Sequence, residues 1–327
     1  MPAISVILPV YNGARYLEQA LGSIREQRIG LDALEVIATD DGSTDASSAI
    51  LAAAAASLPL TVIPGTRRKN WVSSTNLALA RATGDFICFL HQDDRFLPDK
   101  LRALLDAAQR QPDVGVFAHP VRFIDGAGRA IGTWSPPAPA RRLAPAEWFA
   151  PLLVQNNLAV PGVMFRRTLL DSVGFLDESL RYTADWDFWL RIAAKHDFVL
   201  LPEPLAEYRI HREAQTVGFA EKQTEYAGNL QIVLDRHLAT LDAFPEIGRR
   251  EADGFRAMAA LGVATNLWLA SRITDKPQSM TTLAKALWAA GIRNALRYLR
   301  LSRIVPRVLA RLRANVNSRP PSGATSS

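Results

Sequence analysis

The sequence contains only one cysteine among 327 residues, and this scarcity excludes whole classes of protein. A single thiol supports neither a disulfide framework nor a cysteine-rich metal site. Cys88 lies in the apolar run 86–90, where we expect a small buried hydrophobic residue. With 48% hydrophobic and 21% charged residues, the composition is typical of a globular protein, so disorder, collagen and coiled-coil arrays are excluded as the main architecture.

Signals for secretion and membrane insertion are also lacking. The sequence leads from Met1 directly into a strand-like run, without a basic leader, a long apolar segment or a small-residue cleavage site. The most apolar window, 257–273, contains Asn266 and is flanked by Arg256 and Arg272, so it does not predict a membrane span. We therefore expect a soluble or peripheral cytoplasmic protein.

Acidic residues are absent from the C-terminal segment, where the last one is Asp275. From Lys276 onward there are two lysines and eight arginines, a local charge of +10, and removing it from the net +6 leaves the preceding residues with −4. The basic character is therefore a property of the C-terminal segment. This distribution argues against a nucleic-acid-binding body and for an anionic partner at the C-terminal end.

Short β-branched or aromatic runs alternate with helical periods over the first 118 residues. This repetition predicts a mostly parallel central sheet flanked by helices on both faces, which is an α/β fold. We expect strands at 4–8, 35–39, 60–63, 86–90 and 114–118, and helices at 15–27, 45–56, 73–82 and 98–110.

The pattern changes after residue 118. Two strand-like runs, 121–124 and 129–134, surround Asp125-Gly126 and predict a hairpin. The following segments alternate between helix and strand, and the region from about 220 to 317 reads as almost wholly helical. Expected helices here are 145–153, 166–173 and one beginning within 182–191, and expected strands are 161–165, 198–201 and 205–210.

Polar residues follow three of the predicted strands. In an open parallel sheet the ligand crevice lies outside the carboxyl ends of the strands. These ends are the segments 9–13, 40–45 and 91–94, which contain at least four carboxylates and one imidazole. Carboxylates at one edge repel each other, and Mg²⁺ or Mn²⁺ would compensate them, with the phosphates of a nucleotide diphosphate as further ligands of the ion.

Five segments, taken in order, resemble the glycosyltransferases of family 2, which have the GT-A fold. The resemblance covers about residues 3–212 and implies a Rossmann-like GT-A domain, here with a helical C-terminal extension. It implies an inverting transfer of a sugar from a nucleotide-diphosphate sugar, typically UDP-linked, to a saccharide or lipid-linked hydroxyl in polysaccharide or glycan biosynthesis. The five segments are 5–12, 40–45, Asn76 with 82–85, 91–94 and 185–191.

The resemblance also implies roles for individual residues. Asp185 matches the catalytic base near the acceptor, and Asp93 matches the last residue of the metal-binding Asp-x-Asp motif. The implied nucleotide-sugar-binding residues are Pro9, Tyr11, Asn12, Asp40, Asp41, Asn76, Gln92 and Asp93. The implied ligands of Mg²⁺ or Mn²⁺ are Asp93, His91 and His211.

Departures from the family pattern leave alternatives open. His91 replaces the first Asp of the Asp-x-Asp motif, so the ion would rest on Asp93 alone or together with an imidazole, and metal dependence stays open. Ala184 precedes the expected base where the family often has Glu. These departures support the rival interpretation of a catalytically degenerate protein that binds nucleotide-sugars or membranes.

Purely structural roles are alternatives for several of these acidic residues. Asp41 and Asp45 suit a turn and a helix cap, and Asp94 suits a solvated loop. Asp185 and Asp187 both suit the first turn of a helix, where a negative charge is favourable. Two other enzyme classes fit less well, because the first strand is followed by neither the Gly-rich, Arg-containing loop of a nucleotidylyltransferase nor the G-x-G-x-x-G of a dehydrogenase.

The chain divides, on this interpretation, into a GT-A domain at 1–212, a helical extension at 213–317 and a disordered tail at 318–327. Arginines 293, 297, 300, 303, 307 and 311 fall within an arc of about 120° on a helical wheel. This pattern predicts an amphipathic helix interrupted near Pro306. Residues 292–317 would then either lie on an anionic membrane or pack on the preceding helices with a solvated arginine face.

Overall fold

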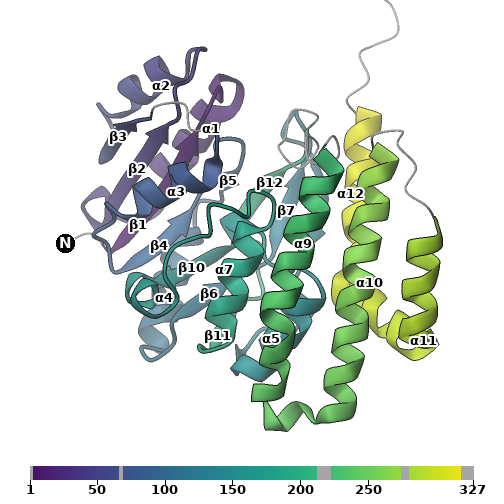
Figure 1. The fold of residues 1–327 in the computed structure, drawn as a ribbon. Helices are drawn as coiled ribbons and strands as arrows, with labels where there is room; N and C mark the ends of the chain where they lie inside the picture. Colours follow the sequence, from purple (N-terminus) through teal and green to yellow (C-terminus); the bar gives the residue numbers. More distant parts are fainter. Residues whose placement is uncertain (1–2, 66–68, 212–221, 274–279, 318–327) are drawn as a thin grey trace, which may run out of the picture.

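A computed structural model describes residues 3–65, 69–211, 222–273 and 280–317 of the chain (Figure 1). Its main sheet has eight strands, and a smaller sheet has four. The main sheet runs, in spatial order, β3 (Leu60–Pro64), β2 (Leu34–Asp40), β1 (Ile4–Val10), β4 (Phe86–Phe89), β10 (Val163–Arg166), β6 (Val116–Ala118), β11 (Phe198–Leu200) and β9 (Arg142–Leu143). The smaller sheet runs β5 (Arg95–Phe96), β12 (Ala206–Arg209), β7 (Val121–Ile124) and β8 (Ala130–Trp134).

The first four strands of the main sheet pair in parallel, as the βα alternation predicts. The second half of the sheet is mixed, because β10 inserts between β4 and β6 and runs antiparallel to both. The edge strand β9 is also antiparallel to its neighbour β11. The run at 114–118 therefore does not extend the parallel array directly, since a strand from later in the chain separates it from β4. The predicted hairpin is present as the antiparallel pair β7–β8.

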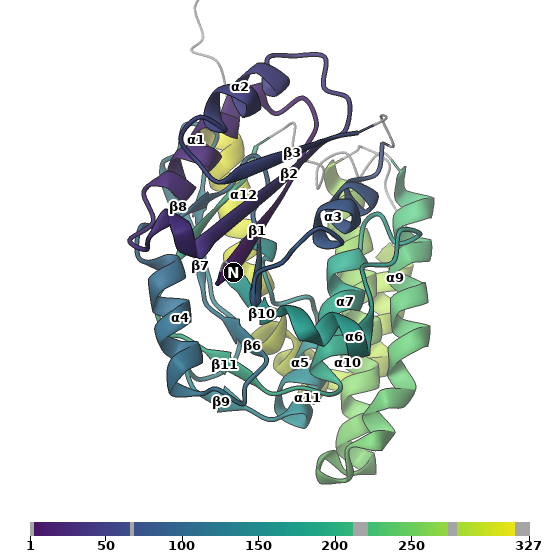
Figure 2. The ribbon, with the colours of Figure 1, turned by 90° about the vertical axis from the view of Figure 1, so that its left-hand side faces the viewer.

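Helices cover both faces of the main sheet, as Figure 2 shows from the side. Strand β1 is apolar on both faces, which is typical of an internal parallel strand. Ile4, Val6 and Leu8 belong to the core beneath α1 and α4, and Ile7 belongs to the core beneath α3 and α7. The helices of this part are α1 (Ala14–Arg25), α2 (Ser47–Ala54), α3 (Trp71–Leu79), α4 (Lys100–Arg110), α5 (Pro145–Val154), α6 (Leu170–Val173) and α7 (Ala184–Ala193).

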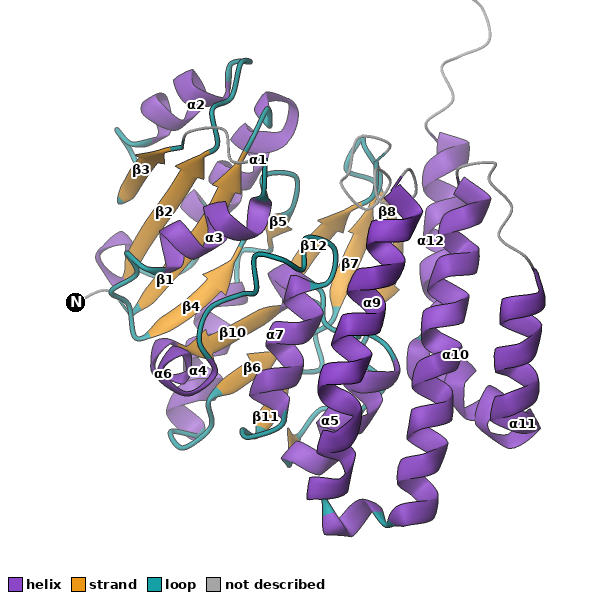
Figure 3. Ribbon diagram, viewed as in Figure 1, coloured by secondary structure: helices purple, strands orange, loops and turns teal. Residues whose placement is uncertain are grey.

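The C-terminal part is helical, in agreement with the predicted pattern (Figure 3). It consists of α9 (Gln223–His237), α10 (Arg249–Ile273), α11 (Met280–Ser302) and α12 (Ile304–Asn317). Helix α10 packs against α5, α9 and α11, whereas α12 returns to the smaller sheet and packs on β8. The boundary predicted after residue 212 and the tail predicted at 318–327 both lie outside the described residues.

The interruption of the basic C-terminal segment lies at Arg303 rather than at Pro306. Arg303 has a φ of 48° and separates α11 from α12, while Gly291, with a φ of 71°, already breaks α11 near its middle. Pro306 lies in the first turn of α12, where its missing N–H costs no helical hydrogen bond. Because of these breaks the arginines from 293 to 311 do not form one continuous stripe. None of the helices in the described parts of the chain is long and apolar enough to span a membrane.

Candidate functional site

The polar ends of β1 and β2 lie side by side because the two strands pair in parallel register up to Val10 and Asp40. Asn12 joins the loops that follow them. Its backbone N–H donates to Ser43 Oγ at 3.0 Å, and its Oδ1 accepts from the Thr44 N–H at 2.8 Å. Asn12 has a φ of 47°, a left-handed conformation that asparagine tolerates better than most residues. The turn sequence therefore builds a rigid double loop at the sheet edge.

The three aspartates of the loop after β2 accept hydrogen bonds from different partners. Both oxygens of Asp40 accept hydrogen bonds, from the Ser43 N–H and from the Ser48 hydroxyl. Asp41 is buried, and its Oδ2 accepts from the Lys69 N–H at 2.8 Å. Asp45 accepts from the Ala14 N–H at 3.0 Å and from the Ser47 N–H at 2.9 Å, which agrees with the capping interpretation.

Gln92 and Asn76 hold neighbouring loops in place through their side-chain amides. Gln92 exchanges two hydrogen bonds with the backbone of Tyr11, at 2.8 and 3.1 Å. Asn76 donates to the Leu176 carbonyl at 2.9 Å and accepts from the Leu176 N–H at 3.2 Å. Pro9 is buried within β1, whereas the Tyr11 side chain is exposed at the rim.

The loop after β4 brings an acidic and histidine cluster to the same edge. Asp93 Oδ2 lies 2.9 Å from His211 Nε2, a contact between residues 118 positions apart. Burial opposes ionisation of Asp93, but the hydrogen bond from His211 and the nearby His91 lower its pKa below the ordinary value. Burial lowers the pKa of His91, against the opposing charge of Asp93. We conclude that an anionic carboxylate and a neutral imidazole adjoin here.

Asp94 is buried rather than solvated, so the loop-charge interpretation is wrong for it. Its Oδ1 accepts from the Arg209 N–H at 2.9 Å, while burial and the charge of Asp93 raise its pKa well above the ordinary value. Arg209 also donates to the Asp93 carbonyl at 2.8 Å and is itself almost fully buried. Asp94 and Arg209 thus fix the position of the loop that presents Asp93.

The cluster has the chemistry of a divalent metal site. One ligand atom from each of His91, Asp93 and Asp94 lies within 4.8 Å of the others. Two further buried atoms, His211 Nδ1 and Asp94 Oδ2, have no hydrogen-bond partner among the described residues. Carboxylate oxygens suit Mg²⁺ and Mn²⁺, and imidazole nitrogen suits transition metals. The residues present therefore fit such an ion.

Asp185 lies in the first turn of α7 and faces the same region. Its Oδ2 accepts a hydrogen bond from Asn156 Nδ2 at 2.8 Å. Burial raises the pKa of Asp185 to about 6, although hydrogen bonds from the Trp186 backbone and from Asn156 oppose the rise. Burial raises the pKa of Tyr208, and the charges of Asp94, Asp93 and Asp185 raise it further. The Tyr208 phenol therefore lies within electrostatic reach of both the acidic cluster and Asp185. The metal-type cluster and Asp185 therefore share one region of the protein.

Asp187 lies on the other side of the same helical turn and is fully buried. Its carboxylate contacts Arg191 and Arg236 at 2.8 Å and His237 at 2.9 Å. Burial opposes the charge, but these partners lower the pKa of Asp187 to about 2. Its role is structural, as the helix-terminus interpretation predicts.

Three residues of this region have no precedent in the sequence reasoning: Asn156, Arg209 and Arg307. Asn156 lies 29 positions before Asp185, and nothing in the local sequence marks it. Arg209 had a usable signal, because it closes a predicted strand two residues before His211. The charge of Arg307, on α12, favours the ionised form of Asp185. The sequence pattern assigned Arg307 to a face of solvated arginines.

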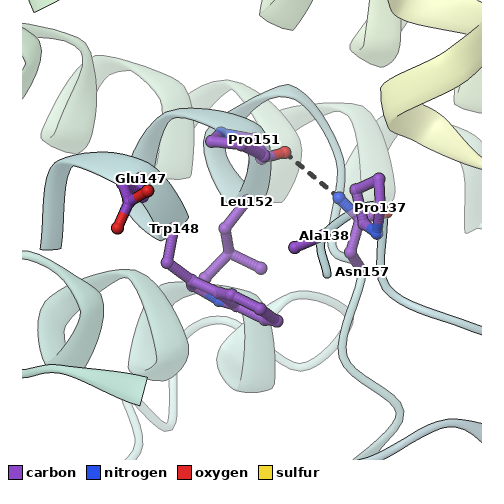
Figure 4. Close-up of a pocket in the computed structure, with 7 residues that line it drawn as sticks. All are labelled: Pro137, Ala138, Glu147, Trp148, Pro151, Leu152 and Asn157. Atoms are coloured by element: carbon purple, nitrogen blue, oxygen red, sulfur yellow. Dashed lines mark hydrogen bonds between the residues drawn. The ribbon is translucent and has the colours of Figure 1, made fainter. Parts of the chain in front are cut away.

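One small pocket lies near α5 and has a different character (Figure 4). Its empty volume is about 200 Å³, below the range of about 300–1,000 Å³ that is usual for small-molecule sites. Asn157 Nδ2 donates to the Pro151 carbonyl across it at 3.1 Å. The pocket is lined by Pro137, Ala138, Glu147, Trp148, Pro151, Leu152 and Asn157, none of which belongs to the predicted site.

Comparison with known proteins supports the resemblance seen in the motifs. The sequence model of glycosyl transferase family 2 matches residues 5–174. An uncharacterized glycosyltransferase of Nostoc sp. (strain PCC 7120) is 30% identical over 235 residues, which cover 70% of this chain and 71% of the relative.

Two solved structures share the fold. TarS of S. aureus (residues 1–349), in complex with UDP-GlcNAc, has a TM-score of 0.56 at 17% identity over 94% of this chain and 92% of that chain. The mannosyltransferase PcManGT from Pyrobaculum calidifontis, in complex with GDP-Man and Mn²⁺, has a TM-score of 0.56 at 17% identity over 97% of this chain and 88% of that chain. Both similarities concern the architecture, which is that of GT-A glycosyltransferases with a C-terminal helical region.

The fold is thus that of a GT-A glycosyltransferase. The match over residues 5–174 and the 30% identical relative place it further: this chain belongs to glycosyl transferase family 2 and is a glycosyltransferase.

Proposed function

We propose that this chain transfers a sugar from a UDP-linked donor to a hydroxyl of a saccharide or lipid-linked acceptor, with inversion, in polysaccharide or glycan biosynthesis. The observation that carries the proposal is Asp185, a carboxylate with a pKa raised to about 6 in the same region as the Asp93 cluster. An inverting transfer needs a base that takes the proton of the accepting hydroxyl as the bond to the sugar forms. A second charged site is needed where the diphosphate departs.

Asp185 is suited to the role of base by its surroundings. A carboxylate with a pKa near 6 is mostly ionised at neutral pH and is more basic than an ordinary aspartate. The hydrogen bonds from Asn156 and from the Trp186 backbone orient the carboxylate. Asn156 is therefore proposed as the positioning residue for the base.

The donor would lie along the strand ends. We assign Mg²⁺ or Mn²⁺ to Asp93 with His91 and His211, and such an ion, when bound, would offset the charge of the departing diphosphate. Tyr11, at the rim, is exposed for contact with the nucleotide. The remaining donor-binding residues proposed for this edge are Pro9, Asn12, Asp40, Asp41, Asn76 and Gln92. Support for the donor class comes from the UDP-GlcNAc and GDP-Man complexes of the two structural neighbours.

Calorimetric titration with UDP, GDP and dTDP, each with Mn²⁺, Mg²⁺ or EDTA, tests the donor site. We expect UDP binding that requires the metal and that weakens at least about 100-fold in Asp93→Ala, since a ligand of the ion is lost. Asp171→Ala, which removes an exposed acid of α6, is the matched control and should bind UDP normally. Absence of nucleotide binding under every condition would instead favour the catalytically degenerate protein.

A peripheral position at the cytoplasmic face of a membrane is a second part of the proposal. After the break at Gly291, α11 exposes 83% of Ile292 and 64% of Leu296 at helical spacing, and Trp288, just before the break, is 88% exposed. Exposed Arg293 and Arg300 accompany this apolar row. An apolar row with basic neighbours is typical of helices that lie in an anionic membrane interface.

Vesicle sedimentation tests this surface. We expect the protein to bind vesicles that contain phosphatidylglycerol more strongly than vesicles of phosphatidylcholine, and the double change Trp288→Ser with Ile292→Ser to abolish the difference. Ile232→Ser, at an exposed apolar residue of α9, is the control. Equal binding of the wild type and the double variant would refute the membrane role.

A further inference from the structure

Helix α12 packs one face against β8 of the smaller sheet. Ala310 and Ala314 are buried in the core on that side, and Arg313 donates to the Ile131 carbonyl at 2.9 Å. Arg307 lies three residues before Ala310, and Arg311 lies three residues before Ala314, so the helical period places both arginines at the border of the buried face. In Figure 2, α12 lies behind β7 and β8, within the body of the protein.

Arg307 is held in this position without a counterion. Its guanidinium lies 5.0 Å from the centre of the Trp134 ring. Its Nη1 is buried and has no hydrogen-bond partner among the described residues. Burial, together with the like charge of Arg311, lowers the pKa of Arg307 to about 10. In the described parts of the chain, neither arginine forms an ion pair with a carboxylate.

Such an arrangement is costly unless a ligand compensates it. Desolvating a guanidinium without a partner destabilises a protein by several kcal/mol in general. Two like charges within reach of each other add to this cost. The stacking on Trp134 offsets part of it, but leaves the buried Nη1 of Arg307 without an acceptor among the described residues. Planar donors of this kind bind phosphate and carboxylate groups.

The pair adjoins the base of the proposed reaction. The charge of Arg307 acts on Asp185, and the charge of Arg311 acts on Tyr208, which also responds to Asp185. Tyr226 responds to all three groups, Arg307, Arg311 and Asp185. These shared influences indicate that both arginines lie near Asp185 and the tyrosines around it.

We infer that Arg307 and Arg311 bind an oxyanion, a phosphate or carboxylate group, of the acceptor and hold its hydroxyl against Asp185. This inference rests on the proposed function, since it takes Asp185 as the base and assigns the donor diphosphate to the site of Asp93. It predicts an acceptor that is negatively charged close to the hydroxyl that receives the sugar. The oxyanion of the donor diphosphate is the other source of the same chemistry, and the test separates the two.

Thermal unfolding with inorganic phosphate as the probe tests the site without requiring activity. We expect 10 mM phosphate, compared with chloride at equal ionic strength, to raise the Tm of the wild type by at least about 2 °C, because a ligand of the folded state stabilises it. The shift should disappear in Arg307→Met and Arg311→Met. It should persist in Arg300→Met, which removes the same charge from an exposed position on α11.

The source of the oxyanion is tested by repeating the measurement with UDP and Mn²⁺ at saturation. An acceptor site predicts that the phosphate shift persists and that Arg307→Met changes the Kd of UDP by less than about threefold. A shift abolished by UDP, with a Kd weakened more than about tenfold in Arg307→Met, would overturn the acceptor assignment in favour of the donor diphosphate.

Equal phosphate-induced shifts in Tm in the wild type, Arg307→Met and Arg311→Met would overturn the oxyanion site itself. Failure of the wild type to bind UDP would refute the proposed donor and leave the phosphate result to stand separately. Arg307→Met also loses the stacking on Trp134, so each phosphate shift is taken relative to the Tm of the same variant in chloride. Loss of the shift is then separate from any change in the stability of the fold.

Discussion

The two sides of the first turn of α7 differ sharply in their electrostatics. Asp185 faces the region of the strand ends with a single side-chain amide as partner, and burial raises its pKa to about 6. Asp187, two residues later, faces the interior and is enclosed by two arginines and His237, which lower its pKa to about 2. The same residue type in the same helix is thus the proposed base at Asp185 and the centre of an ion-pair network at Asp187. What differs is the number of cationic partners that tertiary structure supplies.

The largest expected effect comes from removing the proposed base. Asp185→Asn should lower kcat by about 10³-fold or more, because the amide cannot accept the proton of the attacking hydroxyl. The UDP affinity should remain, since Asp185 is not among the residues proposed to bind the donor. Steady-state transfer and UDP titration of the same preparation measure both. Substantial transfer by a well-folded variant would remove Asp185 from the mechanism.

The opposite carboxylate should act on stability rather than on chemistry. Asp187→Asn leaves the cationic groups of Arg191, Arg236 and His237 without their shared anion, and we expect a loss of about 3–5 kcal/mol in the free energy of unfolding. Urea unfolding measures it. Because the pKa of Asp187 is lowered when folded, its contribution is present above about pH 4 and is lost as the pH falls towards 2. A variant as stable as the wild type at pH 7 would contradict the enclosed ion-pair network.

The pH profile separates the two acids further. The acidic limb of kcat/KM should have an apparent pKa of about 6, the value of Asp185, with transfer lost as the base is protonated. Asn156→Ala removes a hydrogen bond that favours the ionised carboxylate, so the limb should move upward by about half to one unit. Asn157→Ala, at a neighbour that bonds the Pro151 carbonyl, is the matched control. An unmoved limb in Asn156→Ala would assign the titration to another group.

The smallest expected effect is a gain in stability. The pKa of Asp185 is raised on folding, so the stability that its neutral form contributes is lost as the pH rises from about 4 to about 6. Asp185→Asn does not ionise and should therefore have a higher Tm than the wild type at pH 8, with a smaller difference at pH 5. Scanning calorimetry at both values tests this. A lower Tm at pH 8 would show that the carboxylate stabilises the fold.

Much of the parallel part of the fold follows from the sequence. Short β-branched or aromatic runs identify β1 to β4, and helical spacing identifies the helices between them, because both signals are local in the sequence. The insertion of β10 between β4 and β6 does not follow from local pattern. Pairing of distant strands depends on contacts that no short window contains.

The candidate site divides in the same way. Turn chemistry places Asn12, Asp41 and Asp93 at strand ends, and parallel pairing then brings them to one edge. The partners of Asp185 could not be foreseen, since Asn156 and Arg307 come from other elements of the structure. The helical wheel predicted a helix interrupted near Pro306, whereas the break lies at Arg303.

The sequence by itself determined the family, the parallel half of the sheet and the identity of the chemical groups, because residue type and short-range period are local properties. Only the tertiary structure decided which carboxylate has a raised pKa, which is enclosed by cationic partners, and that Arg307 stacks on Trp134. The physical reason is that charge, burial and pKa depend on every group within a few ångströms of an atom. Most of those groups are supplied by residues far away along the chain.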